Sequence, residues 1–179
     1  MATLVPRDFS VEETGATFAE NAWLKALAVC QVTGHCALAD DSGLVVDALA
    51  GRPGVYSARY AGPTASDAQN NDLLLSELEG VPARERTARF VCCLAVARPT
   101  SRGPQRLAEA EGVIEGRILT QPRGVGGFGY DPLFEPLDRP GQSTAELSGE
   151  AKDQISHRGH AARDILRALQ LWLDRQVDL

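Results

Sequence analysis

The sequence predicts a single α/β domain in which helices flank a mixed central β-sheet. Its 179 residues are enough for one domain with a sizeable core. Runs with helical spacing and apolar runs typical of strands alternate in the order helix, strand, helix, strand group, helix. No internal repeat, low-complexity tract or linker interrupts the chain, so we expect one domain over residues 1–179.

The first predicted helix has a clear start and a clear end. Thr17 and Glu20 fit a capping box, in which each side chain accepts from the backbone of the other end of the first turn. We expect the helix to run to about Val32, with Gly34 as its C-terminal cap.

A short strand and a second helix follow. The apolar run 36–39 ends in Asp40-Asp41, so we expect a strand whose carboxyl end presents both aspartates, where open α/β sheets bind ligands. Thr64 is expected to cap a helix that runs to about Leu78. Its buried stripe would consist of Leu74, Leu75 and Leu78.

The second half of the chain predicts strands and then two helices. Residues 89–98 are apolar on both faces, as in a central strand, and 107–119 predict one or two strands interrupted at Gly112 and Gly116. These elements could form an antiparallel meander. Ser148 or Ser143 could cap a short helix, and we expect Ser156 to cap the last one.

The bulk composition excludes some classes of function. The net charge of −6 argues against a duplex nucleic-acid surface, which needs clustered Lys and Arg, but a mononucleotide needs only one basic pocket. No apolar run reaches the roughly 18–20 residues that cross a bilayer. Residues 1–9 lack a signal-peptide pattern, so we expect a cytoplasmic protein.

The cysteines do not indicate a metal or disulfide framework. No Cys-x-x-Cys pair occurs, and the three histidines do not have zinc-finger spacing. We expect reduced and mostly buried thiols at Cys30, Cys36, Cys92 and Cys93.

The segment Gly-Gly-Phe-Gly-Tyr-Asp (126–131) is the most unusual stretch of the chain. Its glycines would let the backbone approach a flat or phosphorylated ligand closely. Phe128 and Tyr130 offer surfaces for stacking on a ring, and Asp131 offers a fixed acceptor. This combination favours a nucleotide base.

Acidic strings in the first half are candidates for a metal site. Mg²⁺ prefers oxygen ligands and usually binds through one or two carboxylates and substrate phosphates, a role open to Asp40-Asp41. The alternative is a polar turn, because Asp, Ser and Gly are turn residues. Glu12-Glu13 adds carboxylates, or forms an exposed acidic loop.

A basic group near the C-terminal helix could complement a phosphate. Lys152 and Arg158 could pair with phosphate oxygens, and His157 could donate to a phosphate or a base carbonyl. The alternative is a solvated helix end.

Five motifs in order resemble the non-canonical purine nucleoside triphosphate pyrophosphatases, also called inosine triphosphate pyrophosphatases. The resemblance covers about residues 12–170. The motifs are Glu-Thr-Gly-Ala-Thr-Phe-Ala-Glu-Asn-Ala (13–22), Ala-Asp-Asp-Ser-Gly-Leu (39–44), Gly-Val-Tyr-Ser-Ala-Arg-Tyr-Ala-Gly (54–62), Gly-Gly-Phe-Gly-Tyr-Asp-Pro (126–132) and Ile-Ser-His-Arg-Gly (155–159).

The resemblance implies an elongated α/β fold, a homodimer and Mg²⁺-dependent hydrolysis of ITP, dITP and XTP to the monophosphate and pyrophosphate. It implies that Asp41 is the general base and, with Glu13, a metal ligand. It also implies that Lys25 helps to hold phosphates. The substrate-binding residues that it implies are Ser42, Phe128, Gly129, Tyr130, Asp131, Lys152, His157 and Arg158.

One departure from the family pattern concerns the start of the chain. Family members begin with a strand, a Thr/Ser-x-Asn-x-x-Lys loop that helps to hold the triphosphate, and a helix, whereas this chain starts Met-Ala-Thr-Leu-Val-Pro. We therefore expect a segment of roughly 25–30 residues to be missing. A catalytically weak nucleotide-binding protein, or a hydrolase for other modified nucleotides, remains an alternative.

Overall fold

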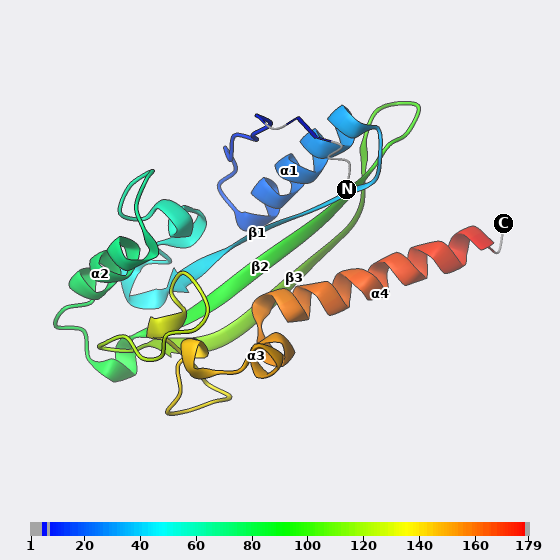
Figure 1. The fold of residues 1–179 in the computed structure, drawn as a ribbon. Helices are drawn as coiled ribbons and strands as arrows, with labels where there is room; N and C mark the ends of the chain where they lie inside the picture. Colours follow the sequence, from blue (N-terminus) through cyan, green and yellow to red (C-terminus); the bar gives the residue numbers. More distant parts are fainter. Residues whose placement is uncertain (1–4, 7, 178–179) are drawn as a thin grey trace.

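Antiparallel strands form the sheet at the centre of the protein (Figure 1), in the order β1-β2-β3-β4. The strands are β1 (Ala37–Val46), β2 (Thr87–Arg98), β3 (Gln105–Ile118) and β4 (Phe134–Pro136). The structure is a computed structural model that describes residues 5–6 and 8–177, so part of the 1–9 segment lies outside the described residues.

The α/β class is confirmed, but the prediction of a mixed sheet is wrong for the described strands. All of their pairs are antiparallel, with Ala37 opposite Ala97 and Thr87 opposite Arg117. The mixed sheet was inferred from a helix lying between two strands. In the structure α2 (Asp67–Glu77) lies beyond the end of the sheet, so the chain turns back and does not make a parallel crossover.

Strand β1 is longer than predicted, and this changes the position of the two aspartates. Asp40 and Asp41 lie in the middle of the strand and not at its carboxyl end. The sequence predicts a strand that ends at these aspartates, with a polar turn that includes Gly43 as the alternative. Gly43 instead lies where other segments approach the strand closely, since a Cβ there would be 2.5 Å from Ser57 Oγ and 2.8 Å from Phe18 Cε1.

Helices cover the two faces of the sheet. Helix α1 (Phe18–Thr33) packs on one face of β1 and β2, and α4 (His157–Val177) packs on the other face, over β2 and β3 (Figure 1). Because side chains alternate along a strand, neighbouring residues of β2 face different helices. The cluster under α1 comprises Ala22, Ala26, Cys30, Ala37, Val91, Cys93, Ala95 and Ala97.

A second hydrophobic cluster lies at the end of the sheet near α2. Leu74 and Leu78 are fully buried there, and Leu75 packs beside them, as the predicted stripe requires. The cluster also includes residues of all four strands and of the loop before β4: Leu44, Val46, Leu49, Ala88, Phe90, Ile114, Ile118, Tyr130, Leu133 and Phe134.

Local capping signals placed most helix starts correctly. Thr17 and Glu20 form the predicted capping box, and Gly34 ends α1 in the left-handed conformation with φ 66°. Ser148 caps α3 (Gly149–Ile155), and Ser156 Oγ accepts from the Gly159 amide at 3.0 Å in the first turn of α4.

The predicted cap of α2 is wrong by two residues. Ser66, and not Thr64, caps this helix, because Ser66 can form a capping box with Gln69.

The burial of the thiols and the hydropathy of the helices agree with what the sequence predicts. Cys30, Cys92 and Cys93 are buried, Cys36 is exposed, and all four are free. Among the described residues, no helix combines the length and the apolar character that crossing a bilayer requires.

Strand β3 is continuous through both glycines that were predicted to interrupt it. Gly112 lies under the first turn of α4, where a Cβ would overlap the carbonyl oxygen of His157 and the amide of Ala161. Gly116 leaves space for the Phe134 ring in the same way. The glycines therefore permit close packing on an uninterrupted strand.

We predict that Gly112→Ala lowers the free energy of unfolding by about 1–3 kcal/mol, because the new methyl group pushes α4 away from β3. Gly149→Ala is the matched control, since a Cβ at Gly149 meets no atom within 4 Å. Denaturant unfolding of both variants checks the prediction, and equal stabilities would contradict it.

Candidate functional site

The predicted substrate-binding residues converge on one cavity. The cavity has a volume of about 280 Å³ and lies between β1, the start of α2, the Gly-rich loop and the start of α4. All eight predicted substrate residues line it: Ser42, Phe128, Gly129, Tyr130, Asp131, Lys152, His157 and Arg158.

The Phe128 ring is the main apolar surface offered to a ligand. Its exposed fraction is 62%, which is high for a large aromatic side chain. Lys152 Nζ lies 4.7 Å and Arg158 Cζ 5.4 Å from the ring centroid. The ring therefore carries two cation–π contacts and retains exposed area on which a planar base can stack.

Asp131 organises the loop that carries Phe128. Its buried carboxylate accepts from the Phe128 amide at 2.8 Å and from Thr144 Oγ1 at 2.9 Å, and it forms an ion pair with Lys152. The sequence predicted Asp131 as an acceptor for a ligand. In the structure this carboxylate already holds the loop and the lysine.

Tyr130 forms part of the cavity wall. Its ring is buried, and its hydroxyl donates to the Ser57 carbonyl at 2.9 Å. Burial raises the pKa of this hydroxyl above its ordinary value, so the tyrosine remains a neutral donor.

His157 is a neutral member of the cavity. Its imidazole is buried and stacks on the Phe90 ring, with 5.0 Å between centroids and an interplanar angle of 13°. Burial and, to a smaller extent, the charges of Arg158 and Lys152 lower the pKa of His157 to about 4. At neutral pH, Lys152 and Arg158 supply the positive charge, and His157 supplies neutral hydrogen-bonding atoms.

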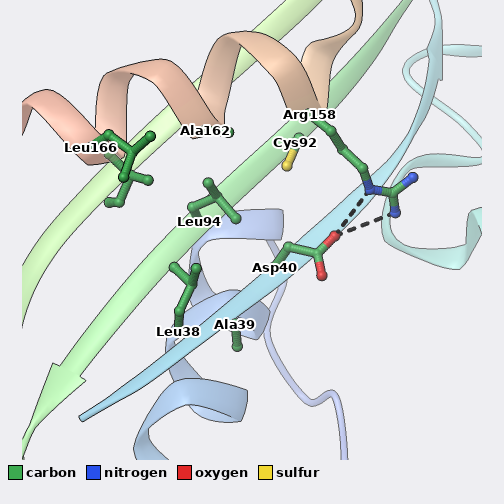
Figure 2. Close-up of a pocket in the computed structure, with 9 residues that line it drawn as sticks. Leu38, Ala39, Asp40, Cys92, Leu94, Arg158, Ala162 and Leu166 are labelled. Carbon is green, nitrogen blue, oxygen red and sulfur yellow. Dashed lines mark hydrogen bonds and ion pairs between the residues drawn. The ribbon is translucent and has the colours of Figure 1, made fainter. Parts of the chain in front are cut away.

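Asp40 connects two of the predicted substrate residues. Its Oδ2 accepts from Ser42 Oγ at 3.1 Å and from Arg158 Nε and Nη2 at 3.3 Å. Figure 2 shows this ion pair at one end of a second, mostly apolar hollow of about 430 Å³ between β1, β2 and α4. Arg158 lines both that hollow and the cavity around Phe128.

The predicted metal-binding carboxylates form a separate cluster on the α1 face of β1. Lys25 Nζ lies 2.9 Å from Glu13 Oε1 and 2.7 Å from Asp41 Oδ1. Arg59 pairs with Glu13 at 3.0 Å, and Asn21 Nδ2 donates to Asp41 Oδ2 at 3.2 Å. One ammonium group thus joins both carboxylates.

The two carboxylates differ in their electrostatic surroundings. Burial raises the pKa of Asp41, and the hydrogen bonds from Lys25 and Asn21 only partly oppose this effect. Burial also acts to raise the pKa of Glu13, but the bonds from Lys25 and Arg59 lower it below its ordinary value. The structure therefore shifts the pKa values of the two carboxylates in opposite directions.

The carboxylate cluster and the cavity are neighbours along two elements. In β1, Asp41 points to the cluster, and the next residue, Ser42, lines the cavity. In the 3₁₀ helix Gly54–Arg59, Ala58 lines the cavity, and Arg59 pairs with Glu13. Asp41 itself does not line the cavity, so the two parts meet across the backbone of β1.

The donor set of the cluster is suited to a cation that also binds substrate. Within the part of the chain that the structure describes, no group of three or more His, Cys, Asp or Glu residues could hold a metal. Glu13 and Asp41 provide two carboxylates at one position. Two carboxylates completed by substrate phosphates are a usual environment for Mg²⁺.

Several residues around the site were not identified from the sequence. Asn21, Asp67 and Asn71 contact Asp41 or Gly129, and Arg59 pairs with Glu13. A signal was available, because Asn21 and Lys25 lie four residues apart on one helix face, as do Asp67 and Asn71. That spacing does not reveal which segment the face contacts.

Known proteins similar to this chain include named pyrophosphatases. The model of the Ham1 family matches residues 1–168. A dITP/XTP pyrophosphatase of Desulforamulus reducens is 54% identical over 168 residues, which cover 93% of this chain and 81% of that protein. One of Geobacter sulfurreducens is 58% identical over 151 residues, which cover 84% and 73%. A HAM1 protein structure from Coxiella burnetii has a TM-score of 0.80 and 43% identity, covering 89% of this chain and 80% of that one.

We predict that protonation of His157 destabilises the fold in acid. Because its folded pKa of about 4 is below the ordinary value of 6.5, the unfolded chain binds a proton that the folded chain lacks between these values. This contribution to stability is complete above about pH 6.5 and is lost as the pH falls toward 4, by roughly 3 kcal/mol at most.

Unfolding free energies of the wild type and His157→Gln at pH 7 and pH 5 measure this effect. The wild type should lose more stability than the variant between the two values. His35→Gln, at an exposed histidine, is the control and should follow the wild type. Equal losses for wild type and His157→Gln would refute the prediction.

Proposed function

This chain belongs to the Ham1 family, and on that premise we propose that it hydrolyses the purine nucleoside triphosphates ITP, dITP and XTP to the monophosphate and pyrophosphate. The names of the relatives, dITP/XTP pyrophosphatase, support the substrate class. The observation that carries the proposal is the position of an aromatic cavity with Lys152 and Arg158 in its wall, next to a two-carboxylate cluster across β1.

In this proposal the cavity binds the purine. The base stacks on Phe128, the donors of His157 and Arg158 meet the 6-oxo oxygen, and Lys152 also binds the substrate. Adenine carries an amino group at that position, so its binding would leave these donors unpaired. Loss of such hydrogen bonds is an effective means of rejecting a substrate.

Asp41 is proposed to accept a proton from the water that attacks the α-phosphorus. A carboxylate with a raised pKa is a better base near neutral pH, and the burial of Asp41 acts in this direction. Lys25 holds Asp41 and Glu13 in one place and balances their charge. When bound by Glu13 and Asp41, Mg²⁺ would neutralise phosphate charge and polarise the reacting oxygens.

A hydrolase is favoured over a catalytically weak nucleotide-binding protein. A binding protein needs a cavity for the purine, but it does not need a buried carboxylate such as Asp41 held by Asn21 and Lys25. The homodimer and the choice of Mg²⁺ remain predictions from the family resemblance, and the cytoplasmic location remains a prediction from the sequence.

We predict that the protein with Mg²⁺ releases pyrophosphate from ITP and XTP at least about 100-fold more efficiently than from ATP, because unpaired buried donors discriminate by about that factor or more. GTP, which has a 6-oxo group and an added 2-amino group, separates recognition at these two positions. Turnover of ITP and XTP no faster than that of ATP would refute the proposed function.

We predict that Asp41→Asn lowers kcat for ITP by about 10²–10⁴-fold, as loss of a general base does. The amide occupies the same space and cannot accept the proton. The melting temperature should change little. Asp164→Asn, at an exposed carboxylate on α4, is the control and should keep full activity. An unchanged rate for Asp41→Asn would exclude Asp41 as the base.

A further inference from the structure

Helix α2 holds the peptide groups on both sides of Gly129. This glycine lies in the loop 124–131 that carries Phe128 and Tyr130, which we call the aromatic loop. The Gly129 amide donates to Asp67 Oδ2 at 2.6 Å, and its carbonyl accepts from Asn71 Nδ2 at 3.1 Å. Asp67 and Asn71 are four residues apart, so they lie on one face of α2. Together they satisfy both backbone groups of this glycine.

These contacts act on the least constrained part of the loop. Tyr130 is fixed by its bond to Ser57, and Asp131 by its bond to Thr144. Gly129 has a φ of 59° and no side chain, and no atom lies within 4 Å of the position of its Cβ. The two bonds from α2 therefore set the path of the backbone that directly follows Phe128.

The hydrogen bonding of Asn71 indicates that its side-chain amide does more than stabilise the fold. Its Oδ1 atom is buried and has no hydrogen-bond partner among the described residues. A buried polar atom without a partner costs free energy, and a leucine of similar size would remove that cost. The carbonyl of Gly129 requires a donor, which fixes the amide in the orientation that leaves Oδ1 unpaired.

Helix α2 is itself tied to the element that contacts the carboxylate cluster. Asn70 is buried, accepts from the Ala61 amide at 2.8 Å and donates to the Ala58 carbonyl at 3.3 Å. Ala58 directly precedes Arg59, which pairs with Glu13. One helix therefore provides a fixed frame for the aromatic loop and for the 3₁₀ helix beside the cluster.

We propose that Asp67 and Asn71 are positioning residues for base recognition: by holding Gly129 they fix the Phe128 ring at the angle at which a purine stacks. This inference rests on the proposed function, in which the cavity takes the base. Loss of either bond should weaken nucleotide binding more than it slows the chemical step, because neither residue belongs to the carboxylate cluster.

The test compares Asn71→Leu and Asp67→Ala with two matched variants. Asp67→Asn keeps an acceptor for the Gly129 amide and should restore most of the binding, and Asp72→Ala changes an exposed carboxylate of the same helix. The measurements are KM and kcat for ITP, the Kd of inosine monophosphate, the melting temperature, and hydrogen exchange of residues 124–131 without nucleotide.

Asn71→Leu should raise KM and Kd about 5–10-fold, as loss of one hydrogen bond does. Its melting temperature should stay near that of the wild type, because the cost of the unpaired Oδ1 is removed together with the bond to Gly129. Its kcat should fall by a smaller factor, and amides of the loop should exchange faster. Asp67→Ala should behave in the same way in binding and exchange. Asp72→Ala should match the wild type in all measurements.

Unchanged KM, Kd and loop exchange in Asn71→Leu and Asp67→Ala would overturn the inference. If Asn71→Leu fails to fold, Asp67→Ala and Asp67→Asn decide, since equal binding by those two also overturns it. A wild type that binds inosine monophosphate but does not hydrolyse ITP contradicts the proposed function alone, and the Kd and exchange values then decide the inference.

Discussion

The site depends on one ammonium group held between two carboxylates. Glu13 and Asp41 repel each other, and burial makes the charge on Asp41 more costly. Lys25 reaches both carboxylates and offsets this cost. In doing so it joins the segment before α1, the helix itself and the central part of β1. Removal of this cation would leave a partly buried pair of like charges, which is strongly unfavourable.

The alternation of side chains along β1 divides the site into two halves. Asp41 faces α1 and its cluster, whereas Asp40 and Ser42 face Arg158 and α4. Strand β1 therefore presents Asp41, the proposed base, on one face and borders the cavity with the other. Within the described sheet β1 is an edge strand, so both of its faces border the same edge. This arrangement explains how one nucleotide could contact both halves.

Much of this architecture follows from local sequence signals. The Thr17 box and Gly34 fix the ends of α1, because caps satisfy backbone groups within a few residues. The signals around α2 were ambiguous, since Thr64 and Ser66 are both good caps. The roles of Gly43 and Gly112 could not be predicted. Each glycine lies where a segment distant in the sequence approaches the strand closely. From the sequence alone, the same glycine is interpreted as part of a turn or as an interruption of the strand.

In the site, too, local motifs predicted which residues take part but not which tertiary contacts they make. The motifs supplied many of the residues that line the cavity and both carboxylates of the cluster. They did not show that Asp131 is already engaged by Lys152, or that α2 holds Gly129. These contacts join residues more than 20 positions apart. They are fixed by packing and not by local pattern.

Paramagnetic relaxation with Mn²⁺ in place of Mg²⁺ tests most directly whether the two halves act on one nucleotide. In the wild type, Mn²⁺ should strongly increase the ³¹P relaxation rate of inosine monophosphate bound in the cavity. Glu13→Gln should still bind the nucleotide and lose this enhancement. No enhancement in the wild type, or an equal enhancement in both proteins, would show that the carboxylate cluster and the base cavity do not share a ligand.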